Sequence, residues 1–264
     1  MKRIVALVSL SISAVLLAPD STWAQLRPHR AEYSLRLGTA LNATRIGSAV
    51  QDIEQGCDGW RIRRELSVDM SLTPSFRVNI TSRTGGEEQR GTNGFTWRTV
   101  QVLNGTEREV RGTVQQRDGA YRVALESSGE PEQSVLPPLT LMPVAAVSYL
   151  VRRLAAGSET FPVLMFGAEA AGAVFLIDVK REAAGPAEAT PPSQRHVAVP
   201  GSRHWPITMA FSRAGQQDSK PLLSLRGRLF DSGVLDRLVA DAGPLTVAAH
   251  LQGLHMHDAP TCPK

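Results

Sequence analysis

The sequence predicts a mainly β protein built from antiparallel strands, with one helix in the middle of the chain. Apolar and polar residues alternate through most segments from position 29 onward, and a side-chain period of two is typical of half-buried strands. Asn-Gly and Asp-Gly pairs separate several of these segments, and such pairs favour tight hairpin turns. Helical and strand patterns do not alternate along the chain, which argues against a parallel α/β sheet.

The first predicted strand covers 31–37, where Tyr33, Leu35 and Leu37 share one face. The next covers 60–68, with Trp60 and Ile62 on one face. Turn residues at intervals of roughly ten positions suggest a sandwich, a barrel or a coiled sheet. The remaining predicted strands are 76–82, 95–103, 106–115, 120–125, 172–180, 206–212, 222–230 and 245–251.

One segment predicts a helix over about 142–156 that packs against the sheet. Pro143 suits the first helical turn, the basic pair Arg152 and Arg153 suits the last, and Gly157 suits the position after the helix. A stripe at helical spacing is expected to face the core. Its members are Met142, Ala145, Ala146, Tyr149, Leu150 and Arg153.

The first 24 residues have the pattern of a secretory signal peptide. Lys2 and Arg3 precede an uncharged, apolar run over 4–18, and Thr22-Trp23-Ala24 offers small residues at the positions that a signal peptidase reads. The run is shorter than the roughly 20 residues of a membrane span, although an uncleaved anchor is the alternative. We therefore expect export to the periplasm and cleavage after Ala24, with no membrane-spanning segment afterwards.

The mature chain, 25–264, is expected to form a single domain. The Pro-rich segment 183–195 has the composition of an exposed loop, and similar strands are predicted on both sides of it. We therefore interpret it as an insertion within one domain and not as a linker between two.

The cysteines of the chain are Cys57 and Cys262. In an oxidising compartment, an even pair predicts a disulfide. The wide separation differs from redox or metal motifs, so the predicted role is structural. Closing a loop of about 200 residues stabilises by up to about 5 kcal/mol. We expect the bond mainly to hold the last strands, around 245–260, which would otherwise be prone to peel away.

No common catalytic motif is present: the sequence lacks the nucleophile elbow, the zinc-protease helix, the P-loop and the dinucleotide-binding turn. The prediction is a protein that is not an enzyme, with no cofactor. The formal net charge is only +4 and the arginines are scattered, which argues against a nucleic-acid partner.

The closest approach to a metal motif is His255-Met256-His257, with His250 upstream. On a strand, His255 and His257 would share a face, and soft ligands suit copper or zinc. A closed site usually needs about four organised ligands. We therefore expect a solvent-exposed tail and no metal site.

Several motifs occur together in an order that is similar to one known family. They are His-Arg-Ala-Glu-Tyr-Ser-Leu at 29–35, Cys-Asp-Gly-Trp at 57–60, Leu-Pro-Pro-Leu-Thr-Leu-Met-Pro at 136–143, Trp-Pro-Ile at 205–207, and the tail from 232 to 262. The chain resembles the EipB family of alphaproteobacterial periplasmic cell-envelope integrity proteins. It departs from the family where Leu139 replaces Gly and Met142 replaces Phe in the helix-entry motif, and where 238–244 replaces Leu-Asp-Tyr-Gly-Asp-Phe.

The resemblance implies a single antiparallel sheet that is coiled into an open, spiral-like barrel, with the helix packed against it. It also implies the Cys57–Cys262 disulfide and a likeness to periplasmic lipoprotein carriers, and it brings no catalytic residues.

The functional hypothesis is a non-enzymatic factor that supports envelope integrity by binding a periplasmic protein partner. The alternative is a carrier of lipid or lipoprotein acyl chains, and a third, disfavoured class is a hydrolase or metalloenzyme. A filled interior with an exposed apolar patch would favour the partner hypothesis. An apolar cavity of several hundred Å3 would favour the carrier.

Overall fold

The computed structural model describes residues 26–40, 42–73, 75–90, 94–127, 129–183, 197–200, 203–216 and 220–262. The predicted signal peptide over 1–24, with cleavage after Ala24, lies outside these residues, and so does most of the predicted loop over 183–195. Within the described ranges, fourteen strands form one sheet. They are β1 (His29–Leu37), β2 (Arg45–Gln55), β3 (Gly59–Thr73), β4 (Phe76–Gln89), β5 (Phe95–Leu103), β6 (Thr106–Arg117), β7 (Ala120–Ser127), β8 (Glu130–Val135), β9 (Thr160–Gly167), β10 (Ala173–Arg181), β11 (His204–Arg213), β12 (Leu223–Phe230), β13 (Leu235–Ala242) and β14 (Leu245–Met256).

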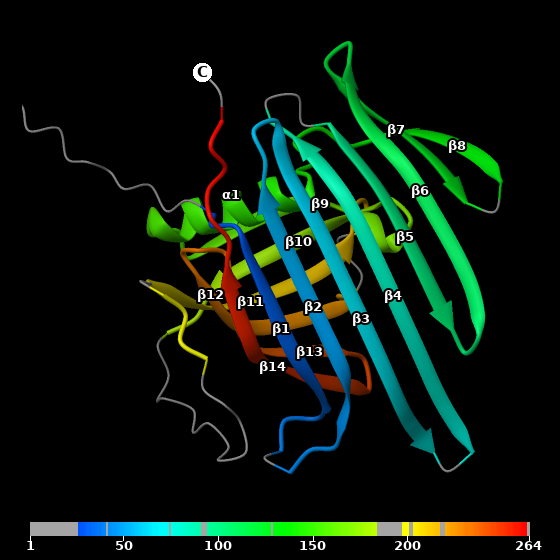
Figure 1. Ribbon diagram of the computed structural model, residues 1–264, viewed down its shortest axis with the longest axis vertical. Helices are drawn as coiled ribbons and strands as arrows, with labels where there is room; N and C mark the ends of the chain where they lie inside the picture. The colour runs from blue at the N-terminus through cyan, green and yellow to red at the C-terminus, as the bar shows by residue number, and fades with distance from the viewer. Residues whose placement is uncertain are drawn as a thin grey trace, which may run out of the picture.

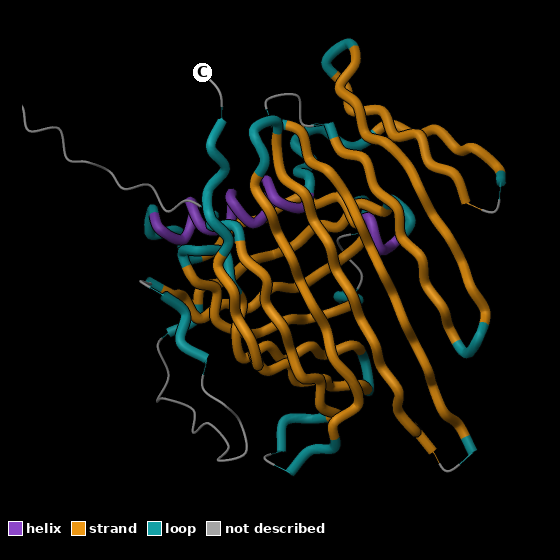
Figure 2. Tube along the Cα trace, in the orientation of Figure 1, coloured by secondary structure: helices purple, strands orange, loops and turns teal. Residues whose placement is uncertain are grey.

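The sheet is antiparallel throughout, and it coils on itself without closing. The strand order is β8-β7-β6-β5-β4-β3-β2-β1-β14-β13-β12-β11-β10-β9, so β8 and β9 are its edges. The first strands of the chain form one steep layer, and β9 to β13 cross behind it obliquely (Figures 1 and 2). The predicted open, spiral-like barrel is therefore confirmed.

The last strand lies in the centre of the sheet. β14 pairs with β1 on one side and with β13 on the other. This pairing on both sides of β14 argues against the expectation that the strand is prone to peel away, which stays a prediction for experiment. The free edges belong instead to the strands on either side of the helix.

Four strands were not predicted: β2, β8, β9 and β13. In β2 and β13 most side chains are half-buried on both faces, which removes a sharp alternation of apolar and polar residues. β8 is almost wholly polar, and β9 is almost continuously apolar. A period of two is visible only where one face is buried and the other is solvated.

The helix, α1 (Pro143–Ala155), connects the two edge strands and lies across one end of the sheet (Figure 1). Beyond its C-terminus, Gly157 has a φ of 86°. Its N–H bonds the Leu154 carbonyl while the Ser158 N–H bonds the Arg153 carbonyl. This Schellman arrangement confirms the predicted end of the helix. None of the described helices has the length and apolarity of a membrane span.

The buried face of α1 is rotated from the predicted stripe. Its buried members are Pro143, Val144, Ala146, Leu150, Val151 and Leu154. Ala145 and Tyr149 are only half-buried, and Arg153 is exposed. The reason is that α1 packs on both halves of the coil: its first turn joins the cluster of Ile62 and Trp97, and its later turns join a second cluster around Ile177 and Trp205.

Both free edges of the sheet have features that weaken further strand pairing. Leu141, just before α1, bonds β9 through the carbonyl of Leu164 and the N–H of Phe166. β9 also contains Pro162, and β8 contains Pro131. Because proline has no N–H to donate, it weakens an edge as a template for a further strand.

Candidate functional site

The predicted disulfide joins the turn after β2 to the C-terminal tail, residues 257–262. Cys57 and Cys262 are bonded, with their Cα atoms 5.5 Å apart, and both are exposed. In β1, His29 lies opposite Ile53 of β2 and Met256 of β14. The turn and the tail therefore leave the sheet at the same end, and the sheet register brings the two cysteines together.

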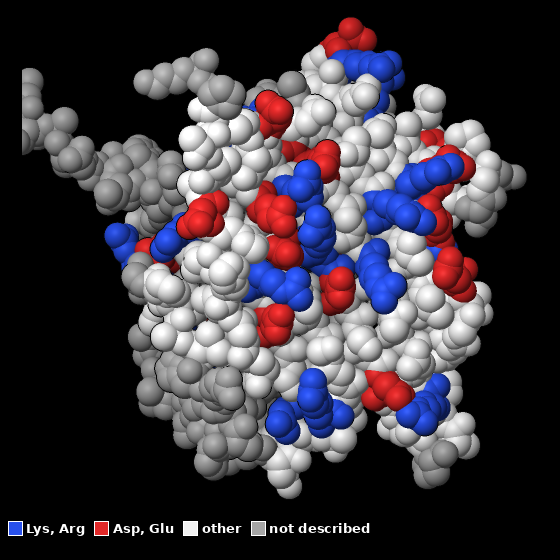
Figure 3. Space-filling model, in the orientation of Figure 1, with Lys and Arg blue, Asp and Glu red and all other residues white. Residues whose placement is uncertain are grey.

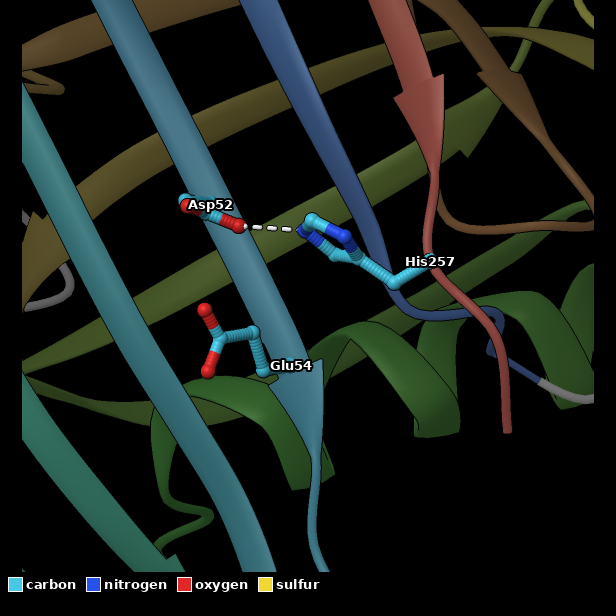
Figure 4. A group of neighbouring side chains, drawn as sticks. All are labelled: Asp52, Glu54 and His257. Atoms are coloured by element: carbon cyan, nitrogen blue, oxygen red, sulfur yellow. Dashed lines mark hydrogen bonds and ion pairs between the residues drawn. The ribbon is translucent and has the colours of Figure 1, made fainter. Parts of the chain in front are cut away.

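A histidine–aspartate contact fastens the same tail (Figure 4). Nε2 of His257 lies 2.7 Å from Oδ1 of Asp52, and the His257 N–H donates to the Pro28 carbonyl at 3.0 Å. Asp52 is buried and also lies 3.6 Å from the Arg30 guanidinium. The expectation of a solvent-exposed tail is therefore wrong at His257. The predicted shared face is confirmed, because the His255 and His257 rings lie 5.2 Å apart.

Asp52, Glu54 and His257 bring three ligand-type atoms within 4.8 Å of one another. The surrounding charge opposes a cation at this position. Arg61 and Arg63 lie 3.4 and 3.7 Å from the Glu54 carboxylate. A metal ion would have to displace these guanidinium groups, so we interpret the group as an ion-pair network that holds the tail.

Glu88 of β4 caps the N-terminus of α1 from across the core. Its carboxylate accepts hydrogen bonds from the N–H groups of Val144 and Ala145 at 2.7 and 2.8 Å. A helix cannot satisfy these groups itself, and the residue at the cap position, Met142, makes no side-chain cap. Burial raises the pKa of Glu88 to about 7, although these hydrogen bonds and the Arg64 charge oppose the rise.

A largely apolar cavity of about 350 Å3 opens on the concave side of the coil. Strands β1 to β5 contribute to its wall from one side, and β13 and β14 contribute from the other. The volume lies within the range of small-molecule sites, about 300–1,000 Å3. The apolar part of the wall includes Ala49, Leu66, Ile80, Leu235, Leu238 and Ala249.

An ion pair lies at the polar side of this cavity. Arg64 of β3 donates through Nη1 to the carboxylate of Glu169 at 2.8 Å, and both residues line the cavity. Glu169 belongs to a short 3-10 helix, η1 (Ala168–Ala170). The backbone carbonyl of Glu169 accepts a hydrogen bond from the side-chain amide of Gln101 in β5. Burial works against ionisation of Glu169, but the Arg64 guanidinium holds the pKa of this carboxyl below its usual value.

The convex side of the front strands is charged and solvated. Figure 3 shows basic and acidic side chains interspersed over this face. They pair across strands, as Arg98 with Glu109 and Arg111 with Glu126. Exposed pairs of this kind contribute only about 0–1 kcal/mol each. The concave cavity is therefore the better candidate for a functional site.

The sequence matches a protein-family model over residues 21–258, and that family is described as EipB-like. The chain belongs to the EipB-like family. Among its relatives, the cell envelope integrity protein EipB of Brucella abortus (strain 2308) is 28% identical over 246 residues, covering 89% of this chain and 85% of the relative.

A solved structure shares the fold of this chain. A β-barrel-like protein of a domain of unknown function from Brucella abortus has a TM-score of 0.73 and 20% identity to this chain. The likeness covers 89% of this chain and 100% of the other. At this level of identity the likeness concerns the fold alone.

The segment before α1 contains a residue in an uncommon backbone conformation. Leu139, where the sequence resemblance led us to expect glycine, adopts a φ of 66° and has 84% of its surface exposed. A left-handed conformation costs an L-residue about 1–2 kcal/mol, whereas glycine tolerates it. The protein therefore retains both backbone strain and an exposed apolar side chain in front of α1.

We expect Leu139→Gly to raise the free energy of unfolding by about 1 kcal/mol, because glycine relieves the strain. Urea unfolding of the two proteins measures this difference. The matched control is Leu139→Ala, which removes the exposed side chain but keeps Cβ, and it should remain near wild type. Equal stabilisation by alanine would assign the effect to the exposed leucine instead of the backbone.

Four charged residues of these sites were not singled out from the sequence: Asp52, Arg64, Glu88 and Glu169. One signal was nevertheless available in β3, whose inward face contains Ile62, Arg64 and Leu66. A single arginine in an otherwise apolar face indicates either a buried ion pair or a ligand site.

Proposed function

We propose that this protein supports cell-envelope integrity from the periplasm as a non-enzymatic binding protein whose cavity holds an apolar chain of a lipid or lipoprotein. The observation that carries the proposal is the cavity of about 350 Å3 on the concave side, with its apolar wall. The name of the Brucella abortus relative supports the envelope role. The cavity favours the carrier alternative over a protein with a filled interior.

A second candidate function is the binding of a periplasmic protein partner. It is favoured by Leu139, which is strained and 84% exposed, and by Val135 at the end of edge strand β8, which is 57% exposed. An exposed apolar side chain that is held in a costly conformation is more typical of a binding position than of a neutral surface. The two functions use different parts of the molecule and are compatible.

Mass spectrometry of lipids extracted from the protein, purified gently from its own periplasm, tests the first proposal. We expect an acyl-chain lipid to accompany the wild type and to be lost from Ala49→Phe, in which the added ring occupies the cavity. Leu66→Trp is a second filling variant if the first folds poorly. Lipid recovered equally from wild type and from folded filling variants, or from neither, would contradict the proposal.

A further inference from the structure

We infer that the cavity selects a single-chain amphiphile with an anionic head group, a carboxylate or a phosphate, and that Arg64 binds this group. The inference rests on the proposed lipid-binding function and adds the chemical class of the ligand. It depends on the position of Arg64, on the hydrogen bonds that this residue leaves unmade, and on the size of the cavity.

Arg64 lies between apolar layers of the concave face. On the same face of β3, Ile62 is 2% exposed and Val68 is 8% exposed, while Leu66 lines the cavity beside Arg64. The arginine side chain itself is 29% exposed. A cation in such surroundings loses hydration, which an acceptor must replace. Apolar packing alone does not explain an arginine at this position.

The hydrogen bonds of Arg64 are incomplete. Its Nη1 bonds Glu169, but its Nε is buried and has no hydrogen-bond partner. A guanidinium presents several N–H donors in a planar fork, which matches the two oxygens of a carboxylate or phosphate. An anionic head group that draws the Arg64 side chain toward the cavity can therefore gain a donor that the protein leaves unused.

Glu169 competes for the same guanidinium. Its side chain is 35% exposed, so the pair can separate without burying an isolated carboxylate. While the pair is intact, the carboxylate repels a second anion and occupies part of the fork. Removing the charge of Glu169 should therefore strengthen the binding of an anionic amphiphile, whereas removing the charge of Arg64 should weaken it. These opposite effects distinguish head-group recognition from general damage to the cavity.

The cavity volume, about 350 Å3, lies near the lower end of the range for small-molecule sites, about 300–1,000 Å3. It fits one acyl chain of medium length better than the paired chains of a phospholipid. Each methylene buried against Leu66, Ile80 and Leu238 should tighten binding by about fourfold, the equivalent of about 0.8 kcal/mol, until the cavity is full.

The test is isothermal titration of the purified mature protein with amphiphiles that share a dodecyl-length chain, each below its micellar concentration. The probes are dodecanoate, dodecyl phosphate, dodecanol and dodecyltrimethylammonium. We expect both anions to bind at least about tenfold more tightly than the alcohol, as a charged hydrogen bond predicts. The cation should bind most weakly. Comparison of the carboxylate with the phosphate distinguishes a fatty acid from a phosphorylated lipid as the source.

Variants of the two charged residues complete the test. Arg64→Gln should remove the preference for anions, and Glu169→Gln should increase it. The matched control is Arg63→Gln on the opposite face of β3, which should leave all affinities unchanged. Arg64→Lys keeps the charge but not the fork and should give an intermediate preference; it replaces the glutamine variant if that one does not fold.

Equal binding of all four probes, or an anion preference that survives in folded Arg64→Gln, would overturn the head-group inference while leaving lipid binding intact. Binding of no probe to the wild type would overturn the inference. Only the additional absence of co-purifying lipid would also remove the proposed function.

Discussion

Replacement of both cysteines, Cys57→Ser with Cys262→Ser, is expected to lower the free energy of unfolding by about 2–5 kcal/mol. The bond links residues 205 positions apart. Its loss gives the unfolded chain more conformational freedom, while the native sheet keeps its pairing. β14 remains bonded to β1 and β13. The loss of native structure should therefore be confined to the tail beyond Met256.

Urea unfolding measures the first effect, and limited proteolysis with fragment mapping measures the second. New cleavage is expected within 257–262 and not within β14. In the cysteine-free protein, His257→Ala should increase this cleavage further, because it removes a side-chain contact with Asp52 that still holds the tail. The exposed neighbour variant His255→Ala serves as the control. Rapid cleavage inside β14 would show that this strand depends on the disulfide after all, and unchanged unfolding would show that the bond contributes no stability.

The sequence was sufficient to predict the class of fold because local chemistry determines it. Tyr33, Leu35 and Leu37 alternate with polar residues because one side of β1 is buried. Gly157 marks the end of α1 because only a few residues adopt its backbone conformation readily. Such signals act within one turn or one strand, so they can be recognised without knowing which elements pack beside it.

The pairing of β1 with β14 could not be predicted in this way. Alternation shows which face of a strand is buried, but it does not identify the strand beside it. The contact between Asp52 and His257 depends on that pairing, as does the union of Cys57 with Cys262 at one end of the sheet. The ion pair of Arg64 with Glu169 likewise joins elements that only the coiling of the sheet brings together.

Glu88 gives the stability of the protein a pH dependence whose sign the structure determines. The pKa of Glu88 is raised from 4.5 to about 7 by burial, so the folded state binds this proton more tightly than the unfolded state. The stabilisation is complete below pH 4.5 and is lost as the pH rises through about 7. A shift of this size corresponds to at most about 3 kcal/mol, and the helix N-terminus reduces it because it favours the charged carboxylate.

We therefore expect Glu88→Gln, whose side chain cannot ionise, not to lose stability in this way as the pH rises. The unfolding free energy of the wild type relative to Glu88→Gln should fall by up to about 3 kcal/mol between about pH 4 and about pH 8. Urea unfolding at several pH values measures the difference. The matched control is Glu87→Gln, because Glu87 is an exposed neighbour on the opposite face of β4. The unfolding free energy of the wild type relative to Glu87→Gln should not fall over this pH range.

A second substitution separates the cap from the charge. Glu88→Ala removes the acceptor of the Val144 and Ala145 N–H groups, and it should destabilise the protein by about 1–3 kcal/mol at about pH 4, where the carboxyl is neutral. Because the wild type itself loses stability on ionisation, this cost should shrink as the pH rises. Parallel pH profiles for wild type, Glu88→Gln and Glu88→Ala would show that the pKa of Glu88 is the same in the folded and unfolded states, and that its two hydrogen bonds and the helix N-terminus balance its burial.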